Sequence, residues 1–345
     1  MSRPVSGGRV RVVVARPTPV ARARLAEALA GDPHLAVVGT AATGHEAVRI
    51  TARLRPSIVL LDAGIGDPGV VETTRAIMID HPTPVVVVAD AADRLEAAFA
   101  ALTAGAVSVQ REPPGGASGA EARFAAVVRA LADVALVRRR ARPSAPPSAT
   151  RRGRARVAAV AGSTGGPAAL QRLLIGLPQG FDLPMLVVQH LPPGHTAQFV
   201  EWLGRSTRRC VRLAEDGQPL TLGHVHVAPD EAHLAVTPEG LLRIERSEPV
   251  DGFRPSATVL FASVARAYGR DAVGLVLSGM GSDGVAGLAE LRDAGGWILV
   301  QDQATSVVFG MPGAAVAAGV AHETVPLDRL AERLAAVGAS TASRS

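Results

Sequence analysis

Several residue types are scarce in this sequence, which has no lysine, no asparagine, one cysteine and only 3% aromatic residues. The single Cys210 excludes an internal disulfide framework and is typical of a reducing compartment. No motif that would supply a base flanks Cys210, so we predict a buried small hydrophobic residue rather than a nucleophile. Because aromatics are few, the cores must be built from Ala, Val and Leu, which suits buried parallel strands covered by helices.

Long apolar runs are also missing. No run approaches the ~20 apolar residues that a membrane-spanning helix needs, and the N-terminus lacks the apolar segment of a secretion signal. We therefore expect a soluble, cytoplasmic protein with no direct membrane insertion.

Positive charge comes from one residue type only. All 36 basic residues are arginines, and against 31 acidic residues they leave a net charge of +5. A nucleic-acid-binding protein normally combines a basic face with a recognisable motif or with aromatic stacking residues, and this sequence shows neither. We therefore expect no nucleic-acid partner.

The length of 345 residues predicts two domains. In residues 9–137, short β-rich runs alternate with helical stretches, which predicts an α/β fold with a doubly wound parallel sheet. The predicted strands are 9–15, 35–39, 57–62, 84–89 and 107–110, and the predicted helices are 20–30, 44–54, 70–80, 94–104 and 120–137.

Residues 138–155 are rich in Arg, Pro and Ser and show no apolar periodicity, so we predict a flexible linker. Contact of this charged segment with a membrane or with nucleic acid is the alternative interpretation.

Residues 156–336 repeat the α/β pattern and predict a second doubly wound, Rossmann-like domain. We expect 223–237 to form a strand or a hairpin, and the tail from Val337 to fray. The other predicted strands are 156–161, 184–189, 272–277 and 297–301, and the predicted helices are 167–177, 196–206, 257–268, 285–294 and 314–318.

Three residues with catalytic chemistry each follow a predicted strand of the second domain: Ser163, His190 and Asp283. In an open parallel sheet the carboxyl ends of the strands share one edge, where ligands bind, so these residues can converge. A serine nucleophile needs an adjacent base, which histidine supplies near neutral pH, and a carboxylate can orient the imidazole. We expect Ser163 Oγ near His190 Nε2 and Asp283 near His190 Nδ1, each at about 3 Å.

Each of these residues also has a simpler explanation. Ser163 could cap a helix or belong to a phosphate-binding loop, His190 could merely end a strand, and Asp283 could shape a turn. The neighbouring Gly165 and Gly166 would allow a tight strand-to-helix turn and let a substrate approach the backbone. The helix that follows would offer free N–H groups to a developing oxyanion.

Four stretches resemble the signatures of the chemotaxis protein-glutamate methylesterases of the CheB family. These are AGSTGG at 161–166, QHLPPGHT at 189–196, LSGMGSDG at 277–284, and the segment from VQD at 300–302 to VFGMP at 308–312. The resemblance implies hydrolysis of glutamate methyl esters on methyl-accepting chemotaxis receptors, with release of methanol and often with deamidation of receptor glutamines. A chemotaxis histidine kinase is a second candidate partner.

Carried over by motif, the resemblance implies that Ser163 is the nucleophile, His190 the general base and Asp283 the orienting acid. It also implies that the Met280 backbone N–H helps to form an oxyanion hole, with simple packing of Met280 as the alternative. Thr164 would line the substrate site, and His195 would cap a helix or lie at the surface. No cofactor is expected.

A histidine cluster suggests a metal site as a competing hypothesis. His224 and His226 lie on one face of a predicted strand, with His233 nearby. Only Asp230 and Glu231 accompany them as further ligands, so we predict a solvated strand face and no metal site.

The first domain resembles a response-regulator receiver, in which Asp62 matches the phospho-acceptor. Phosphoryl transfer there would need a divalent cation held by carboxylates. The positions where the family has its acidic pair, hydroxyl residue and lysine hold Ala15-Arg16, Ala89 and Glu112 instead. We therefore expect that Arg16 pairs with Asp62, and that the domain regulates by docking rather than by magnesium-dependent phosphorylation.

Two other functions are carried forward. One is a non-catalytic regulatory module that uses both domains only for binding. The other is an amidase that acts on receptor glutamine with the same three residues.

Overall fold

The structure, a computed structural model, describes residues 9–90, 94–116, 118–132 and 155–338. The chain divides into two compact units, Met1–Leu136 and Val137–Ser345. The predicted linker lies outside the described residues except for Ala155, whose side chain is buried. Within the described ranges, no helix is long and apolar enough to cross a membrane.

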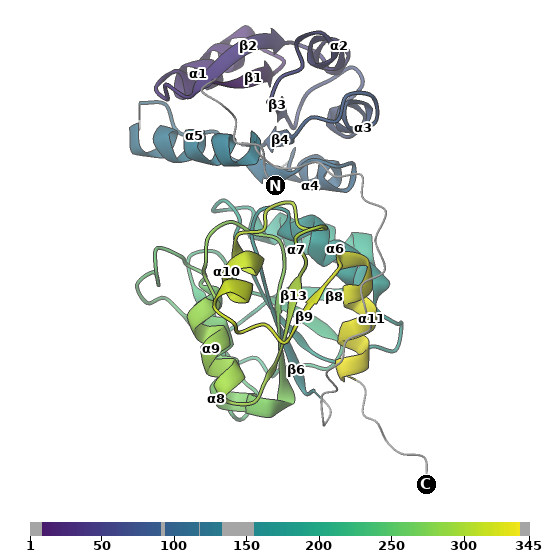
Figure 1. The fold of residues 1–345 in the computed structure, drawn as a ribbon, viewed down its shortest axis with the longest axis vertical. Helices are drawn as coiled ribbons and strands as arrows, with labels where there is room; N and C mark the ends of the chain where they lie inside the picture. The colour runs from purple at the N-terminus through teal and green to yellow at the C-terminus, as the bar shows by residue number, and fades with distance from the viewer. Residues whose placement is uncertain (1–8, 91–93, 117, 133–154, 339–345) are drawn as a thin grey trace. The chain divides into compact units, whose positions relative to one another are not determined.

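The first unit is a five-stranded sheet with helices on both faces (Figure 1). Every neighbouring pair of strands is parallel, in the order β2-β1-β3-β4-β5, which confirms the predicted doubly wound fold. The strands are β1 (Val10–Ala15), β2 (Leu35–Ala41), β3 (Ile58–Asp62), β4 (Val85–Val88) and β5 (Ser108–Gln110). The helices are α1 (Pro19–Ala30), α2 (Gly44–Leu54), α3 (Val70–Asp80), α4 (Leu95–Thr103) and α5 (Ser118–Ala132).

Local sequence explains where these helices begin. Thr18 accepts a hydrogen bond from the Ala21 N–H at the start of α1, and Pro19 occupies the first turn, where no N–H is needed. Helices α1 and α5 contact each other, while α3 contacts both α2 and α4. The inner strands β1, β3 and β4 are almost entirely buried, as continuous Val and Leu runs predict, whereas the edge strand β2 is mostly only partly buried.

The second unit is built on a seven-stranded sheet in the order β14-β13-β12-β6-β7-β9-β8, in which every pair is parallel. Two further strands, β10 and β11, form a separate antiparallel pair. The strands are β6 (Val157–Gly162), β7 (Met185–Gln189), β8 (Cys210–Leu213), β9 (His224–Val227), β10 (His233–Val236), β11 (Leu242–Glu245), β12 (Ala272–Val276), β13 (Trp297–Gln301) and β14 (Glu323–Val325).

Helices cover both faces of this sheet, so the second α/β prediction is also confirmed (Figure 1). Helices α8, α9 and α10 pack as one group, and α6 contacts α7 and α11 in another. The helices are α6 (Gly166–Gly176), α7 (Thr196–Thr207), α8 (Ala257–Tyr268), α9 (Val285–Asp293), α10 (Met311–Ala317) and α11 (Leu327–Gly338).

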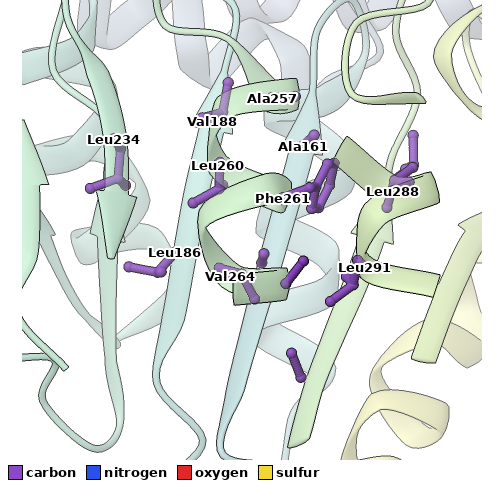
Figure 2. Packing of buried hydrophobic residues seen from close by; sticks show 14 of the residues in the cluster. Ala161, Leu186, Val188, Leu234, Ala257, Leu260, Phe261, Val264, Leu288 and Leu291 are labelled. Atoms are coloured by element: carbon purple, nitrogen blue, oxygen red, sulfur yellow. The ribbon is translucent and has the colours of Figure 1, made fainter. Parts of the chain in front are cut away.

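Helix α8 is anchored by its apolar face. Figure 2 shows Leu260, Phe261 and Val264 of α8 directed toward the strands and toward α9, within a cluster that also contains Leu186 and Leu291. All five side chains are fully buried. This packing holds the amino end of α8 in a defined place beside the sheet.

Three sequence expectations for this unit are wrong. Segment 223–237 is neither one strand nor a hairpin, because β9 joins the large sheet while β10 pairs with β11. Cys210 lies on the edge strand β8 and is only partly buried. The predicted frayed tail begins too early, since Val337 is buried in the last turn of α11, and residues 339–345 lie outside the described residues.

Candidate functional site

The three predicted catalytic residues follow three neighbouring strands at the centre of the second sheet. Strand β6 lies between β12 and β7, and the chain leaves β6 toward β7 but later returns to β12 on its other side. Ligands bind at such a reversal of strand order in open α/β sheets. Ser163, His190 and Asp283 follow β6, β7 and β12 respectively.

The backbone of Ser163 is held on both sides. Its N–H donates to the Ser278 carbonyl at 3.1 Å, and its carbonyl accepts from Gln189 Nε2 at 2.8 Å. The His190 N–H donates to the Gly162 carbonyl at 2.9 Å, so the residues after β6 and β7 lie side by side. Helix α6 begins at Gly166 with Gly165 as its cap residue, so the interpretation of Ser163 as a helix cap is wrong.

The two glycines after Ser163 make room for protein groups. Gly165 has a φ of +80°, and a Cβ there would lie 2.7 Å from Ser278 Oγ. A Cβ on Gly166 would lie 2.2 Å from Gln189 Oε1. Their close neighbours are Val307 and the two side chains that hold the Ser163 turn, Ser278 and Gln189. Approach of a substrate to the backbone of these glycines stays a prediction.

His190 and Asp283 form a hydrogen-bonded pair in which His190 Nε2 lies 2.9 Å from Asp283 Oδ2. This reverses the predicted use of the ring, because Nε2 rather than Nδ1 faces the carboxylate. His190 Nδ1 is buried and has no hydrogen-bond partner among the described residues. The predicted short contact between Ser163 Oγ and Nε2 is therefore wrong, and Nδ1 is the ring nitrogen left to accept a proton.

Asp283 is buried at the amino end of α8, where its carboxylate collects donors. It accepts hydrogen bonds from Ser256 Oγ at 2.8 Å, the Ala257 N–H at 2.7 Å and the Thr258 N–H at 3.1 Å. Burial alone would raise the pKa of Asp283, but the hydrogen bonds from His190, Ala257 and Ser256 outweigh it and lower this pKa. Asp283 therefore stays ionised and fixed in orientation, and it does more than shape its own turn.

Phe253 is a site residue that sequence reasoning missed. Its ring stacks on His190 with centroids 4.6 Å apart and an interplanar angle of 12°. Phe253 lies in an irregular segment before α8, and a lone phenylalanine there carries no motif. Only the folded chain reveals its contact with the imidazole.

Met280 and Thr164 lie in the two loops that meet beside Ser163. Ser278 Oγ donates to the Thr164 carbonyl at 2.7 Å and also accepts from the Val308 N–H at 2.9 Å. Ser163, Thr164, His190 and Met280 are all partly exposed, whereas Asp283 is buried. A substrate can thus reach the hydroxyl and the imidazole while the carboxylate stays shielded from water.

The other histidines differ from expectation. His226 and His233 are fully buried, so the predicted solvated strand face is wrong. His195 occupies the cap position of α7 but makes no side-chain cap hydrogen bond, and it is buried rather than at the surface. The part of the chain that the structure describes holds no cluster of three or more His, Cys, Asp or Glu residues arranged for a metal ion.

In the first unit, Asp62 ends β3 and is held by two guanidinium groups. Arg16 Nε lies 2.7 Å from Asp62 Oδ2, which confirms the predicted pair, and Arg94 Nη1 lies 3.2 Å from Oδ1. Arg16 also contacts Asp90 at 3.2 Å and Glu112 at 2.6 Å. Burial alone would lower the pKa of Arg16, but the bonds to Glu112 and Asp62 outweigh it and raise this pKa.

The divalent cation that a receiver would hold does not fit this pocket. Asp62, Asp90 and Glu112 each contact the Arg16 guanidinium, which is itself 6% exposed, so a fixed positive charge already lies where a cation would have to bind. The sequence predicted that Arg16 pairs with Asp62, but it did not predict that Asp90 and Glu112 also contact Arg16.

Comparison with known proteins identifies the family of this chain. The family model described as CheB methylesterase matches residues 158–334. This chain belongs to the CheB methylesterase family. The protein-glutamate methylesterase/protein-glutamine glutaminase 4 of Myxococcus xanthus is 46% identical over 341 residues, covering 94% of this chain and 96% of that protein. The corresponding protein 3 of Anaeromyxobacter dehalogenans is 45% identical, covering 94% of this chain and 98% of its own length.

A solved structure of a CheB methylesterase catalytic domain, from Thermotoga maritima, matches with a TM-score of 0.50 and 31% identity. It covers 52% of this chain and 97% of that domain. The alignments with these two relatives cover 94% of this chain, which is more than the second unit spans. These CheB methylesterase relatives therefore share the first unit as well.

Proposed function

We propose that this chain hydrolyses methyl esters of glutamate side chains on methyl-accepting chemotaxis receptors and releases methanol. The observation that carries the proposal is the buried Asp283 bound to His190, beside Ser163, at the switch point of a CheB methylesterase sheet. The relatives named protein-glutamate methylesterase/protein-glutamine glutaminase support the same substrate class.

In the proposed mechanism, His190 donates Nε2–H to Asp283 and accepts the Ser163 hydroxyl proton on Nδ1. The Ser163 oxygen then attacks the ester carbonyl carbon, and the Met280 N–H stabilises the resulting oxyanion. Return of the proton from His190 to the methoxy oxygen releases methanol and leaves an acyl-enzyme. Water, deprotonated by His190, hydrolyses that acyl-enzyme and restores Ser163.

This mechanism requires one side-chain movement. No hydrogen bond joins Ser163 to His190 Nδ1 in the described structure. We infer that Ser163 rotates toward Nδ1 when a substrate occupies the site, because catalytic hydrogen bonds commonly tighten only in the substrate complex.

The test is methanol release from methylated receptor by the full chain. Ser163→Ala should lower the rate by about 10⁴-fold or more, because the nucleophile and its base act as a unit. Receptor binding by the wild-type chain without methanol release would instead establish the non-catalytic binding module. Ammonia release from receptor glutamine, lost in the same variant, would add the glutaminase activity.

For the first unit we propose regulation without magnesium-dependent phosphorylation, because Arg16 occupies the carboxylate pocket around Asp62. Acetyl phosphate with Mg²⁺, or a phosphorylated chemotaxis histidine kinase, should leave the mass of the intact chain unchanged. Stoichiometric labelling at Asp62 would overturn this proposal, and labelling from the kinase alone would identify the kinase as a partner.

A further inference from the structure

We propose that His233 is a positioning residue for the catalytic triad, acting through the segment that carries Phe253 and Ser256. The inference rests on the proposed esterase function. Nothing in the motifs around Ser163, His190 and Asp283 involves His233, which lies on β10, outside the large sheet.

The His233 imidazole is fully buried and uses both of its nitrogens. Its Nδ1 accepts a hydrogen bond from the Ser256 N–H at 3.1 Å, and its Nε2 lies 3.1 Å from the Glu248 carbonyl. A carbonyl only accepts and an amide N–H only donates, so the two bonds define one tautomer, with the proton on Nε2. His233 thus joins the two ends of the segment from Glu248 to Ser256.

One end of this segment orients Asp283. Ser256 is the cap residue of α8, and its hydroxyl donates to Asp283 Oδ1 at 2.8 Å while accepting from the Thr258 N–H at 3.2 Å. The Ser256 backbone N–H is bound by His233. A continuous series of hydrogen bonds therefore runs from His233 through Ser256 and Asp283 to His190.

The middle of the same segment orients His190 directly. Phe253 stacks on the imidazole, and a tight turn closed by reciprocal backbone hydrogen bonds between Val250 and Phe253 presents its ring. His233 holds the start of this segment through Glu248. Loss of His233 would therefore loosen both the carboxylate and the aromatic neighbour of His190.

A satisfied core histidine with no catalytic influence is the competing explanation, and the chain supplies a matched control for it. His226 is equally buried, on the neighbouring β9, and its Nε2 accepts a weak bond from the Thr221 N–H at 3.5 Å. In the part of the chain that the structure describes, no hydrogen bond connects His226 with Asp283. A general effect of removing a buried imidazole should therefore appear equally in His226 and His233 variants.

The test compares His233→Asn, His233→Gln and His233→Leu with His226→Gln in the full chain. Asparagine can place an oxygen near the position of Nδ1 and keep the Ser256 bond, whereas glutamine can reach the Glu248 carbonyl but not Ser256. Groups that orient a metal-binding histidine contribute 10- to 100-fold, and we expect the same range for a group that orients the His190–Asp283 pair. We expect kcat to fall by about that factor in His233→Gln and His233→Leu with KM nearly constant, and by less in His233→Asn.

A second readout is independent of the receptor: the rate at which a fluorophosphonate labels Ser163. It should fall in the same order as kcat. Unchanged kcat and labelling in His233→Asn and His233→Gln, or an equal loss in His226→Gln, would overturn the proposal. If His233→Leu does not fold, the contrast between the asparagine and glutamine variants decides.

Failure of the proposed function gives a different result. The wild-type chain would then release no methanol from methylated receptor, yet fluorophosphonate labelling of Ser163 would still reveal whether His233 positions the site.

Discussion

Each unit of this protein has a buried aspartate at the carboxyl end of its parallel sheet, and the two aspartates, Asp283 and Asp62, have opposite kinds of partner. The Asp283 side chain is 0% exposed and is bound by neutral donors and one imidazole. The Asp62 side chain is 4% exposed and is bound by two guanidinium groups. An imidazole can exchange its proton near neutral pH, whereas a guanidinium cannot. The Asp283–His190 pair can therefore take part in proton transfer, whereas the Asp62–Arg16 pair stays a permanent ion pair.

The residues around Asp283 and Asp62 also differ in their exposure to solvent. His190 and Ser163 are partly exposed whereas Asp283 is buried, so a substrate can reach the pair for which we propose proton transfer. Arg16 is buried against Asp62, and Arg94 covers the other carboxylate oxygen. A phosphoryl donor or a cation would first have to displace these arginines.

The largest expected effect is in the second unit. Asp283→Asn should lower kcat for ester hydrolysis by about 10⁴-fold, because the amide disfavours the productive tautomer of His190 and no longer stabilises its charged form. Methanol release and fluorophosphonate labelling would both measure the loss. Asp62→Asn should leave the esterase rate of the isolated enzyme within a few-fold, and an equal loss in that variant would mean that the two carboxylates are not independent.

Removal of Arg16 tests the first unit. Arg16→Ala should destabilise this unit by about 3–5 kcal/mol, since three carboxylates lose their buried partner. Mg²⁺ should then raise the stability of the variant but not that of the wild type, as urea denaturation with and without the ion would show.

Arg94→Ala is the matched control for Arg16→Ala. The Arg94 side chain is 48% exposed, so its loss should cost less than about 1 kcal/mol. Equal destabilisation by the two substitutions would contradict the central role of Arg16.

His226, a buried imidazole with no carboxylate partner among the described residues, gives a smaller expected effect than Arg16. Burial, together with the charges of His224 and Arg212, lowers the pKa of His226 from 6.5 to about 4. The unfolded chain then binds the proton more readily, so stability falls as the pH drops from about 6.5 to 4, by at most about 3 kcal/mol. His226→Gln should flatten this part of the curve of unfolding free energy against pH. An unchanged slope would show that other groups cause it.

Much of the fold could be predicted from the sequence, because the local sequence of most helices and strands favours the structure that they adopt. The bounds predicted for α2, α3, α8 and β13 match the structure; Thr43 and Ser256 cap α2 and α8, and the apolar pattern marks α3 and β13. The edge strands β8 and β14 and the small antiparallel β11 were missed, because short, half-exposed strands carry no continuous apolar run. Periodicity also could not show that β9 and β10 enter different sheets.

The residues of the catalytic proposal likewise come from the sequence, which places Ser163, His190 and Asp283 after three strands whose ends must share one edge. Only tertiary structure decided which nitrogen of His190 faces Asp283, that Phe253 stacks on the ring, and that His233 joins the ends of their supporting segment. The tertiary structure also decided that Arg16 contacts Asp90 and Glu112 in addition to Asp62. The reason is physical: strand order and motifs depend on neighbours along the chain, whereas ring orientation and buried ion pairs depend on contacts between residues far apart in it.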